Sequence, residues 1–208
     1  MNEKECSARG TPILLPEGVC SLADSQITKK ALACAVKALV CQKGVDKVSV
    51  GDITKECGMG RQSFYYHFQD KFELLEWVYQ QEAFSGLSSD VTLQNLPQKM
   101  EQMLTIMEQE RKFYITAIKA YPNLFSDCLG KILKQLFLQI IERLDSTHSV
   151  DVERREFGAD FYAMGCCAVI VQWAQKGMRL PAEKLAQELY ILAKDSERAA
   201  ARMINEPK

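Results

Sequence analysis

Hydrogen-bonding side chains crowd one short window in the first third of the chain. The window follows a turn that contains Gly58 and Gly60. Phe64 and Phe68 lie four residues apart and predict the inward side of a short helix. The outward side is left with five side chains that can each hydrogen-bond a phosphate or the edge of a base: Arg61, Gln62, Ser63, Tyr65 and His67. This combination predicts a helix that reads a nucleic acid.

A second short helix is predicted immediately before the turn. Ser49 is a favourable N-cap, and Asp52 lies three residues on, where its carboxylate can return a bond to the Ser49 N–H. Val50 and Ile53 share the apolar face, and Gly58 stands where a left-handed residue is wanted at the helix end. Two helices in this order predict a DNA-reading helix-turn-helix, although periodicity alone is equally compatible with an ordinary pair of core helices.

The match to a known pattern extends on both sides of the turn. It takes in Gly58–Phe68, Asp70-Lys71 and Leu74-Leu75, and upstream of them Ile27-Thr28, Ala35, Leu39, Gly44, Val48-Ser49-Val50 and Ile53. Over residues 27–75 the chain resembles the DNA-binding domain of the TetR family of bacterial transcription regulators. Two positions depart from the family pattern: Gly60 stands where a Ser or Thr cap is common, and Thr54 where Ala is common.

The resemblance implies roles for the polar side chains. Arg61, Gln62 and Ser63 are expected to read base edges. Phosphate contacts are expected from Thr28, Ser49, Tyr65, His67 and Lys71, and Tyr66 belongs to the same DNA-binding set. The implied partner is a double-stranded DNA operator. A two-fold dimer presents two recognition helices, at about residues 60–67, in opposite orientation, so the operator should be an imperfect inverted repeat.

The charge is distributed unevenly along a chain whose net charge is only −1. Residues 28–71 hold eight Lys and Arg against four Asp and Glu, a local charge of +4. Residues 72–208 hold sixteen bases against nineteen acids, a local charge of −3. A basic head on an acidic body is the electrostatic footprint of a DNA-reading domain joined to a domain with a different partner.

The 208 residues are expected to form an all-α protein with three parts. Residues 1–21 are expected to be a flexible extension, with the alternative that translation starts at Leu22. Residues 22–75 form the three-helix DNA-binding domain, and residues 76–208 form a larger helical regulatory and dimerisation domain. Helices are predicted at 28–43, 71–84, 97–109, 110–120, 124–144, 153–176 and 182–203, with a loop at 85–95 as the domain boundary.

The predicted helix at 153–176 is apolar on nearly all sides from Phe157 to Val171. Such a helix must be covered on all sides. With the last helix it is able to form the four-helix bundle of a homodimer, and spacing alone gives comparable weight to a central core helix in a monomer. The resemblance implies the dimer, because TetR-like proteins pair through their last two helices.

Large apolar side chains between the head and this helix form a tentative effector pocket. They are Met103, Met107, Phe113, Tyr114, Ile118, Tyr121, Phe125, Tyr162 and Trp173. Plain core packing is the more frequent outcome for such a stripe. The stretches 113–125 and 161–177 weakly resemble the dihydroxyacetone-kinase regulator group of the family, which implies that either a small-molecule effector or a partner sensor protein supplies the signal.

Several other classes of protein fit the sequence poorly. His67 and His148 are the only two histidines, and no nucleophile–base pair or Gly-rich phosphate loop accompanies them, so an enzyme is not expected. The eight cysteines form no CxxC or Cys/His ligand set, so no metal or cofactor is expected. The cysteines are expected to be small buried hydrophobic residues in a reducing cytosol, which predicts a cytoplasmic protein. No apolar run is expected to reach membrane-spanning length. The main rival is a helical interaction module that kept the fold without specific DNA binding.

Overall fold

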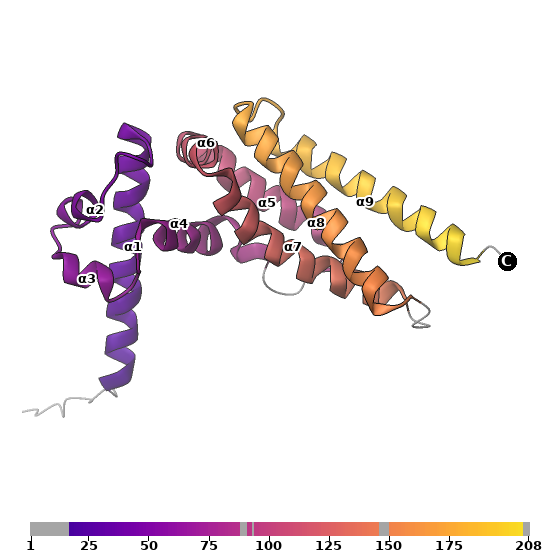
Figure 1. The fold of residues 1–208 in the computed structure, drawn as a ribbon, viewed down its shortest axis with the longest axis horizontal. Coiled ribbons are helices and arrows are strands. Elements are labelled where there is room, and N and C mark those ends of the chain that lie inside the picture. The colour runs from indigo at the N-terminus through magenta and orange to yellow at the C-terminus, as the bar shows by residue number, and fades with distance from the viewer. Residues whose placement is uncertain (1–16, 88–90, 93, 146–149, 206–208) are drawn as a thin grey trace, which may run out of the picture.

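The computed structural model describes residues 17–87, 91–92, 94–145 and 150–205, which contain helices and no strand (Figure 1). This confirms the all-α prediction. In chain order the helices are α1 (Glu17–Lys43), α2 (Val50–Glu56), α3 (Arg61–Tyr65), α4 (Lys71–Val78), the π-helical turn η1 (Tyr79–Ala83), the 3-10 turn η2 (Ser85–Leu87), α5 (Leu96–Gln109), α6 (Arg111–Ala120), α7 (Pro122–Leu144), α8 (Val152–Gln175) and α9 (Ala182–Asn205).

A small head and a longer helical body are joined by α4 (Figure 1). In the head, α1 packs against α2 and α4, and α2 packs against α3. Leu32 of α1, Ile53 of α2 and Phe64 of α3 are all fully buried, as is Leu74 of α4. The apolar face predicted for the helix-turn-helix is therefore the face that the head buries.

The first helix is longer than the sequence pattern predicted. It begins at Glu17 rather than at residue 28, so residues 17–21, which were assigned to a flexible extension, are helical. Residues 17–27 contain no proline and only one glycine, Gly18, so nothing in this stretch interrupts the helix. Residues 1–16 lie outside the described part of the chain. At the other end, Gly44 adopts φ +80° and ends the helix as predicted.

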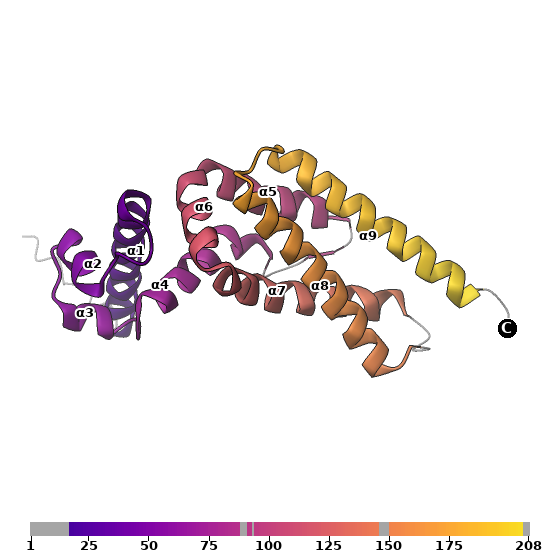
Figure 2. The same cartoon turned by 45° about the horizontal axis from the view of Figure 1, so that its top comes forward.

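Two long helix pairs form the body. α7 packs along α8, and α9 lies along α5 (Figure 2). One side of α8 is buried through Ala159, Ala163 and Ile170, but Phe157 on the other side remains 73% exposed. The expectation that this helix is covered on all sides is therefore met only on its inner side within one chain.

By length and composition α8 is also able to cross a membrane, with a mean hydropathy of 1.3 over its most apolar stretch. The expectation that no apolar run reaches that length was therefore wrong. One such helix is weak evidence of a membrane span, because the core helix of a helical bundle passes the same test. Here 33% of the stretch is buried inside the body, where α8 packs on α7 and α6.

A capping box starts α2, as predicted. The Ser49 hydroxyl accepts a hydrogen bond from Asp52 N at 3.1 Å, and Ser49 N donates to Asp52 Oδ2 at 2.8 Å. Lys43 Nζ lies 3.0 Å from the same carboxylate oxygen. The bonds from Ser49, together with Lys43, hold the pKa of the Asp52 carboxyl well below its usual range. This network fixes the helix start that precedes the turn.

We predict that Ser49→Ala lowers the free energy of unfolding by about 1 kcal/mol, because one N-terminal N–H of α2 loses its side-chain acceptor. Urea denaturation followed by circular dichroism measures the change. Ser63→Ala, which alters an exposed serine inside α3, is the matched control and should change stability by less than about 0.5 kcal/mol. Equal effects of the two substitutions would contradict the capping role.

Candidate nucleic-acid interface

The turn between α2 and α3 depends on glycine. Gly58 adopts φ +66°, a left-handed conformation that favours glycine, and its N–H donates to the Lys55 carbonyl at 3.1 Å. Gly60 caps α3 without a side-chain hydrogen bond, as its type requires. The helix ends at Tyr65 rather than at residue 67, because residues 66–67 form a turn that brings Phe68 back into the core. The recognition helix is therefore shorter than predicted.

α3 lies on the head, away from the body (Figure 1), and its polar side chains are exposed to solvent. Arg61, Gln62 and Ser63, the three predicted base readers, are exposed. Tyr65 and Tyr66 are 57% and 81% exposed, far more than tyrosines that serve in a core. The structure therefore brings these five predicted DNA-binding residues together on one accessible surface.

His67 lies at the edge of this surface and is half-buried. Its ring packs edge-on against Tyr66, with the ring centroids 4.9 Å apart. Partial burial and the nearby Lys29 lower the pKa of His67, which favours the neutral imidazole. A neutral imidazole is able to donate one hydrogen bond to a phosphate but does not add a full positive charge.

The positive charge beside His67 comes from Lys29, which was not among the DNA-binding residues predicted from the sequence. Lys29 of α1 lies with its Nζ 5.7 Å from the centroid of the Phe68 ring. α1 thus brings a lysine next to the recognition surface from a helix that is distant in sequence. The Lys29-Lys30 pair, which directly follows Ile27-Thr28, was the available signal, but periodicity places it on the outer side of α1 without saying which neighbour it meets.

Arg61 lies back over α2 and not straight out from α3. A Cβ atom at Gly51 would lie 2.8 Å from Arg61 Nη2 and 3.4 Å from its Cζ. The absence of a side chain at Gly51 is thus what allows the guanidinium to rest there. Base readout by Arg61 therefore requires its side chain to swing away from α2 on binding.

Three of the predicted phosphate contacts have other positions or bonds in the structure. Lys71 Nζ donates to the carbonyls of Val45 and Val48, at 2.9 Å in each case, so the side chain ties the loop after α1 to the start of α4. The Ser49 hydroxyl is occupied by the capping box. Thr28 lies in the interior of the extended α1 and not in its first turn.

The predicted effector residues are mostly packed core. Met103, Met107, Phe113, Tyr114, Ile118 and Phe125 have at most 2% of their surface exposed. Tyr162 packs against Phe137 with ring centroids 5.5 Å apart, and Trp173 Nε1 donates to the Leu180 carbonyl at 2.7 Å. Tyr121 lies instead at the joint between body and head, with its ring against Phe72. In this structure most of the predicted pocket residues therefore pack in the core and do not line a pocket.

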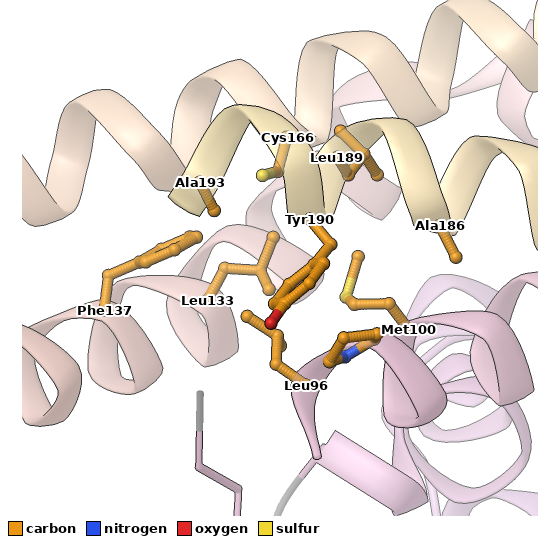
Figure 3. A pocket seen from close by; sticks show the side chains of 10 residues that line it. Leu96, Met100, Leu133, Phe137, Cys166, Ala186, Leu189, Tyr190 and Ala193 are labelled. Atoms are coloured by element: carbon orange, nitrogen blue, oxygen red, sulfur yellow. The ribbon is translucent and has the colours of Figure 1, made fainter. Parts of the chain in front are cut away.

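Two hollows border the body. A narrow cavity of about 20 Å³ lies beneath α9 and is lined by apolar side chains that include Met100, Phe137 and Tyr190 (Figure 3). It has room for about one water molecule. A more open groove of about 460 Å³ lies between α5 and the turns η1 and η2, and Met103 is the one predicted pocket residue on its lining.

Two family profiles match the chain. Residues 35–78 match the family described as bacterial regulatory proteins of the tetR family, and residues 94–195 match a family described as the C-terminal region of transcriptional regulators. These two ranges cover the helix-turn-helix and most of the body.

The chain belongs to the TetR family of transcriptional regulators.

Individual relatives agree with this assignment. The chain is 26% identical over 169 residues to the HTH-type dhaKLM operon transcriptional activator DhaS of Lactococcus lactis subsp. lactis (strain IL1403). The matched region covers 79% of this chain and 88% of that protein. A solved structure of the dihydroxyacetone kinase operon activator DhaS superposes with a TM-score of 0.64 at 23% identity, over 84% of this chain and 98% of the other.

A TetR-family regulator from Syntrophomonas wolfei str. Goettingen gives a TM-score of 0.60 at 14% identity, over 83% of this chain and 95% of the other. At these identities the solved structures show a shared fold. As a TetR-family member the chain is a DNA-binding transcription regulator, which confirms the function predicted from residues 27–75.

We predict that Lys71→Ala has two effects. It removes the charged donor to two backbone carbonyls and should lower the free energy of unfolding by about 1–3 kcal/mol. It should also weaken binding to all duplexes alike, because the remaining N–H of this ammonium group no longer meets a phosphate. Lys47→Ala, at an exposed lysine in the loop that Lys71 contacts, is the control for stability.

Urea denaturation measures the first effect of Lys71→Ala, and a salt titration of binding to a random duplex measures the second. A variant as stable as Lys47→Ala would contradict the tether. Unchanged salt dependence would restrict Lys71 to a structural role and overturn the predicted phosphate contact.

Proposed function

We propose that this TetR-family chain binds an inverted-repeat operator as a homodimer, reads it with α3, and responds to a signal received in the body. The observation that supports it most directly is the exposure of Arg61, Gln62 and Ser63 on one side of a basic head. An interaction module without DNA binding has no need of five exposed hydrogen-bonding side chains around a buried Phe64. The proposal gives the chain no catalytic step.

The outer side of α8 supports pairing of two copies. Phe157, Phe161 and Met164 are spaced four and three residues apart, so they lie on one face of the helix, and they are 73%, 65% and 72% exposed. Ala168 continues the same line, and Leu192 of α9 is 62% exposed. An apolar surface of this kind marks an interface. A second copy would offer the same surface, as two-fold pairing requires.

The signal is proposed to enter at an aromatic cluster formed by Tyr79 of η1, Phe113 and Tyr114 of α6, and Phe125 of α7. Tyr79 and Tyr114 are fully buried, their rings are 6.0 Å apart, and neither hydroxyl has a hydrogen-bond partner among the described residues. Burial raises the pKa of both phenols, so both remain protonated donors. Buried donors without acceptors are costly, and a small molecule with acceptor oxygens or a rearrangement driven by a partner protein would relieve that cost.

The similarity to DhaS concerns the regulatory outcome. DhaS is named as an activator of the dhaKLM operon. We therefore propose transcriptional activation as the outcome to test first for this chain, in a reporter assay downstream of the operator that it selects.

We predict that Gln62→Ala relaxes sequence preference and leaves binding to random DNA nearly unchanged. A bidentate amide contact to a base contributes about 1–3 kcal/mol of discrimination, and alanine removes it. Competition of operator against random duplex measures the ratio. Gln80→Ala, at an exposed glutamine of η1 outside the helix-turn-helix, is the matched control. Equal loss on operator and random duplex for Gln62→Ala would contradict base reading.

We predict that Phe161→Glu converts the dimer into monomers, because pairing would bury an uncompensated carboxylate. Leu144→Glu, at the 48% exposed leucine that ends α7, is the control and should leave the dimer intact. Light scattering gives the oligomeric state, and circular dichroism verifies the fold. A folded Phe161→Glu dimer would place the interface on another surface.

A further inference from the structure

A charged cluster joins the head to the body. Lys37 of α1 lies with its Nζ 2.7 Å from Glu82 Oε2 and 2.7 Å from Glu110 Oε1. Glu82 belongs to the turn η1, and Glu110 lies at the corner between α5 and α6. The three side chains are 16%, 29% and 40% exposed, so solvent reaches the cluster only in part. We call these three residues the Lys37 clasp.

The two carboxylates of the clasp keep the Lys37 ammonium group charged. Burial alone would lower the pKa of Lys37, but the hydrogen bonds to Glu110 and Glu82 and their negative charges outweigh it and raise the pKa above its ordinary value. Lys37 is therefore charged throughout the physiological range. If the lysine moves away, two carboxylates that both lie within reach of one ammonium group are left to repel each other.

Each glutamate of the clasp belongs to, or is hydrogen-bonded to, a segment that carries part of the aromatic cluster. Glu82 shares the turn η1 with Tyr79. The Glu110 carbonyl accepts hydrogen bonds from Phe113 N at 2.9 Å and from Tyr114 N at 3.2 Å. The Tyr79 ring lies 6.2 Å from Phe113 and 6.0 Å from Tyr114. A displacement of either tyrosine therefore changes the separation of the two carboxylates.

The turn that carries Glu82 departs from regular α-helical geometry. η1 is π-helical, and Phe84 N donates to the Tyr79 carbonyl at 2.9 Å, which includes one residue more than an α-helical bond. Return to α-helical geometry would rotate the residues after the turn by about 100° about the helix axis. Glu82 lies within this turn, so a change of its geometry would also shift Glu82 relative to Lys37.

We propose that the Lys37 clasp couples the aromatic cluster to the DNA-binding head: it closes when Tyr79 and Tyr114 are arranged as in this structure and opens when the cluster is rearranged. The inference rests on the proposed entry of the signal at that cluster. When the clasp opens, the head remains joined to the body through α4, through the packing of α1 on α6, and at Tyr121, whose hydroxyl donates to Asp46 and whose ring lies 4.9 Å from Phe72. The head then shifts about these remaining contacts.

The first test removes the clasp. Lys37→Met should increase amide hydrogen exchange both at the end of α1 and in the first turn of α6, and should lower operator affinity by about 5- to 30-fold, because two loosened heads must be ordered on binding. Lys134→Met is the matched control. It breaks a 2.9 Å ion pair to Asp160 inside the body and should change neither measurement.

A second arm separates the clasp from a general loss of stability. Adding Glu82→Gln and Glu110→Gln to Lys37→Met removes the carboxylate repulsion and should restore part of the lost thermal stability, but it should not restore operator affinity. Full recovery of affinity in the triple variant would overturn the coupling role.

The third arm perturbs the cluster directly. Cys128 is buried on α7 near Tyr79, and Cys128→Met overpacks that site. It should change operator affinity by about threefold or more with the clasp intact and by less than about twofold in the Lys37→Met background. Equal changes in both backgrounds would overturn the proposal. If wild-type protein bound no operator, the proposed function would fail, and unchanged hydrogen exchange in Lys37→Met would then overturn the clasp separately.

Discussion

The burial of Phe64 and Phe68 is the interaction on which the DNA-facing surface depends. α3 has only five residues, too few to be stable as a helix by itself, so its position comes from packing. Phe64 is fully buried in the head, and the Phe68 ring packs edge-on against Trp77 of α4, with centroids 6.0 Å apart. Because both aromatic side chains point inward, the remaining side chains of α3 face the solvent.

The helices that bury these two aromatic side chains also place the surrounding charges. α1 supplies Leu32 to the core and Lys29 to the edge of the surface, so the helix that buries α3 also makes its surroundings positive. Lys71 fastens the loop between α1 and α2 from the start of α4. Local charge and local packing are thus produced by the same few elements, which explains how a chain of net charge −1 presents a basic head.

Much of this arrangement was predictable because its causes are local. The capping box at Ser49 and the left-handed Gly58 each depend on residues close together in sequence, and both were confirmed. The helices of the body were placed within a few residues because Pro122 and Gly177 interrupt the pattern plainly.

Features that depend on packing between distant elements were not predictable in this way. The start of α1 at Glu17 was missed because the matched pattern on which the prediction rested begins only at Ile27-Thr28. Arg61 resting on Gly51, Lys29 beside His67 and the Lys37 clasp each join segments whose proximity no spacing rule reveals. The effector residues illustrate the same limit, since an apolar stripe has the same pattern whether it lines a cavity or fills a core.

The body combines two unsatisfied features that point in different directions. The exposed apolar side of α8 faces outward and calls for a second copy, whereas the buried hydroxyls of Tyr79 and Tyr114 face inward and call for a hydrogen-bonding partner. In the proposed function, the first would set how many heads reach the DNA, and the second would offer a means to change how they are held. The proposed function therefore places pairing and signalling on different parts of the same helical body.

Selection of bound duplexes from a random pool by the full chain, followed by sequencing, tests the central claim most directly. The account predicts enrichment of an imperfect inverted repeat whose half-sites are centred about one helical turn, or a multiple of it, apart, because two recognition helices must reach grooves on the same face of the duplex. Enrichment of a single unrepeated site, or no enrichment above the input pool, would contradict it.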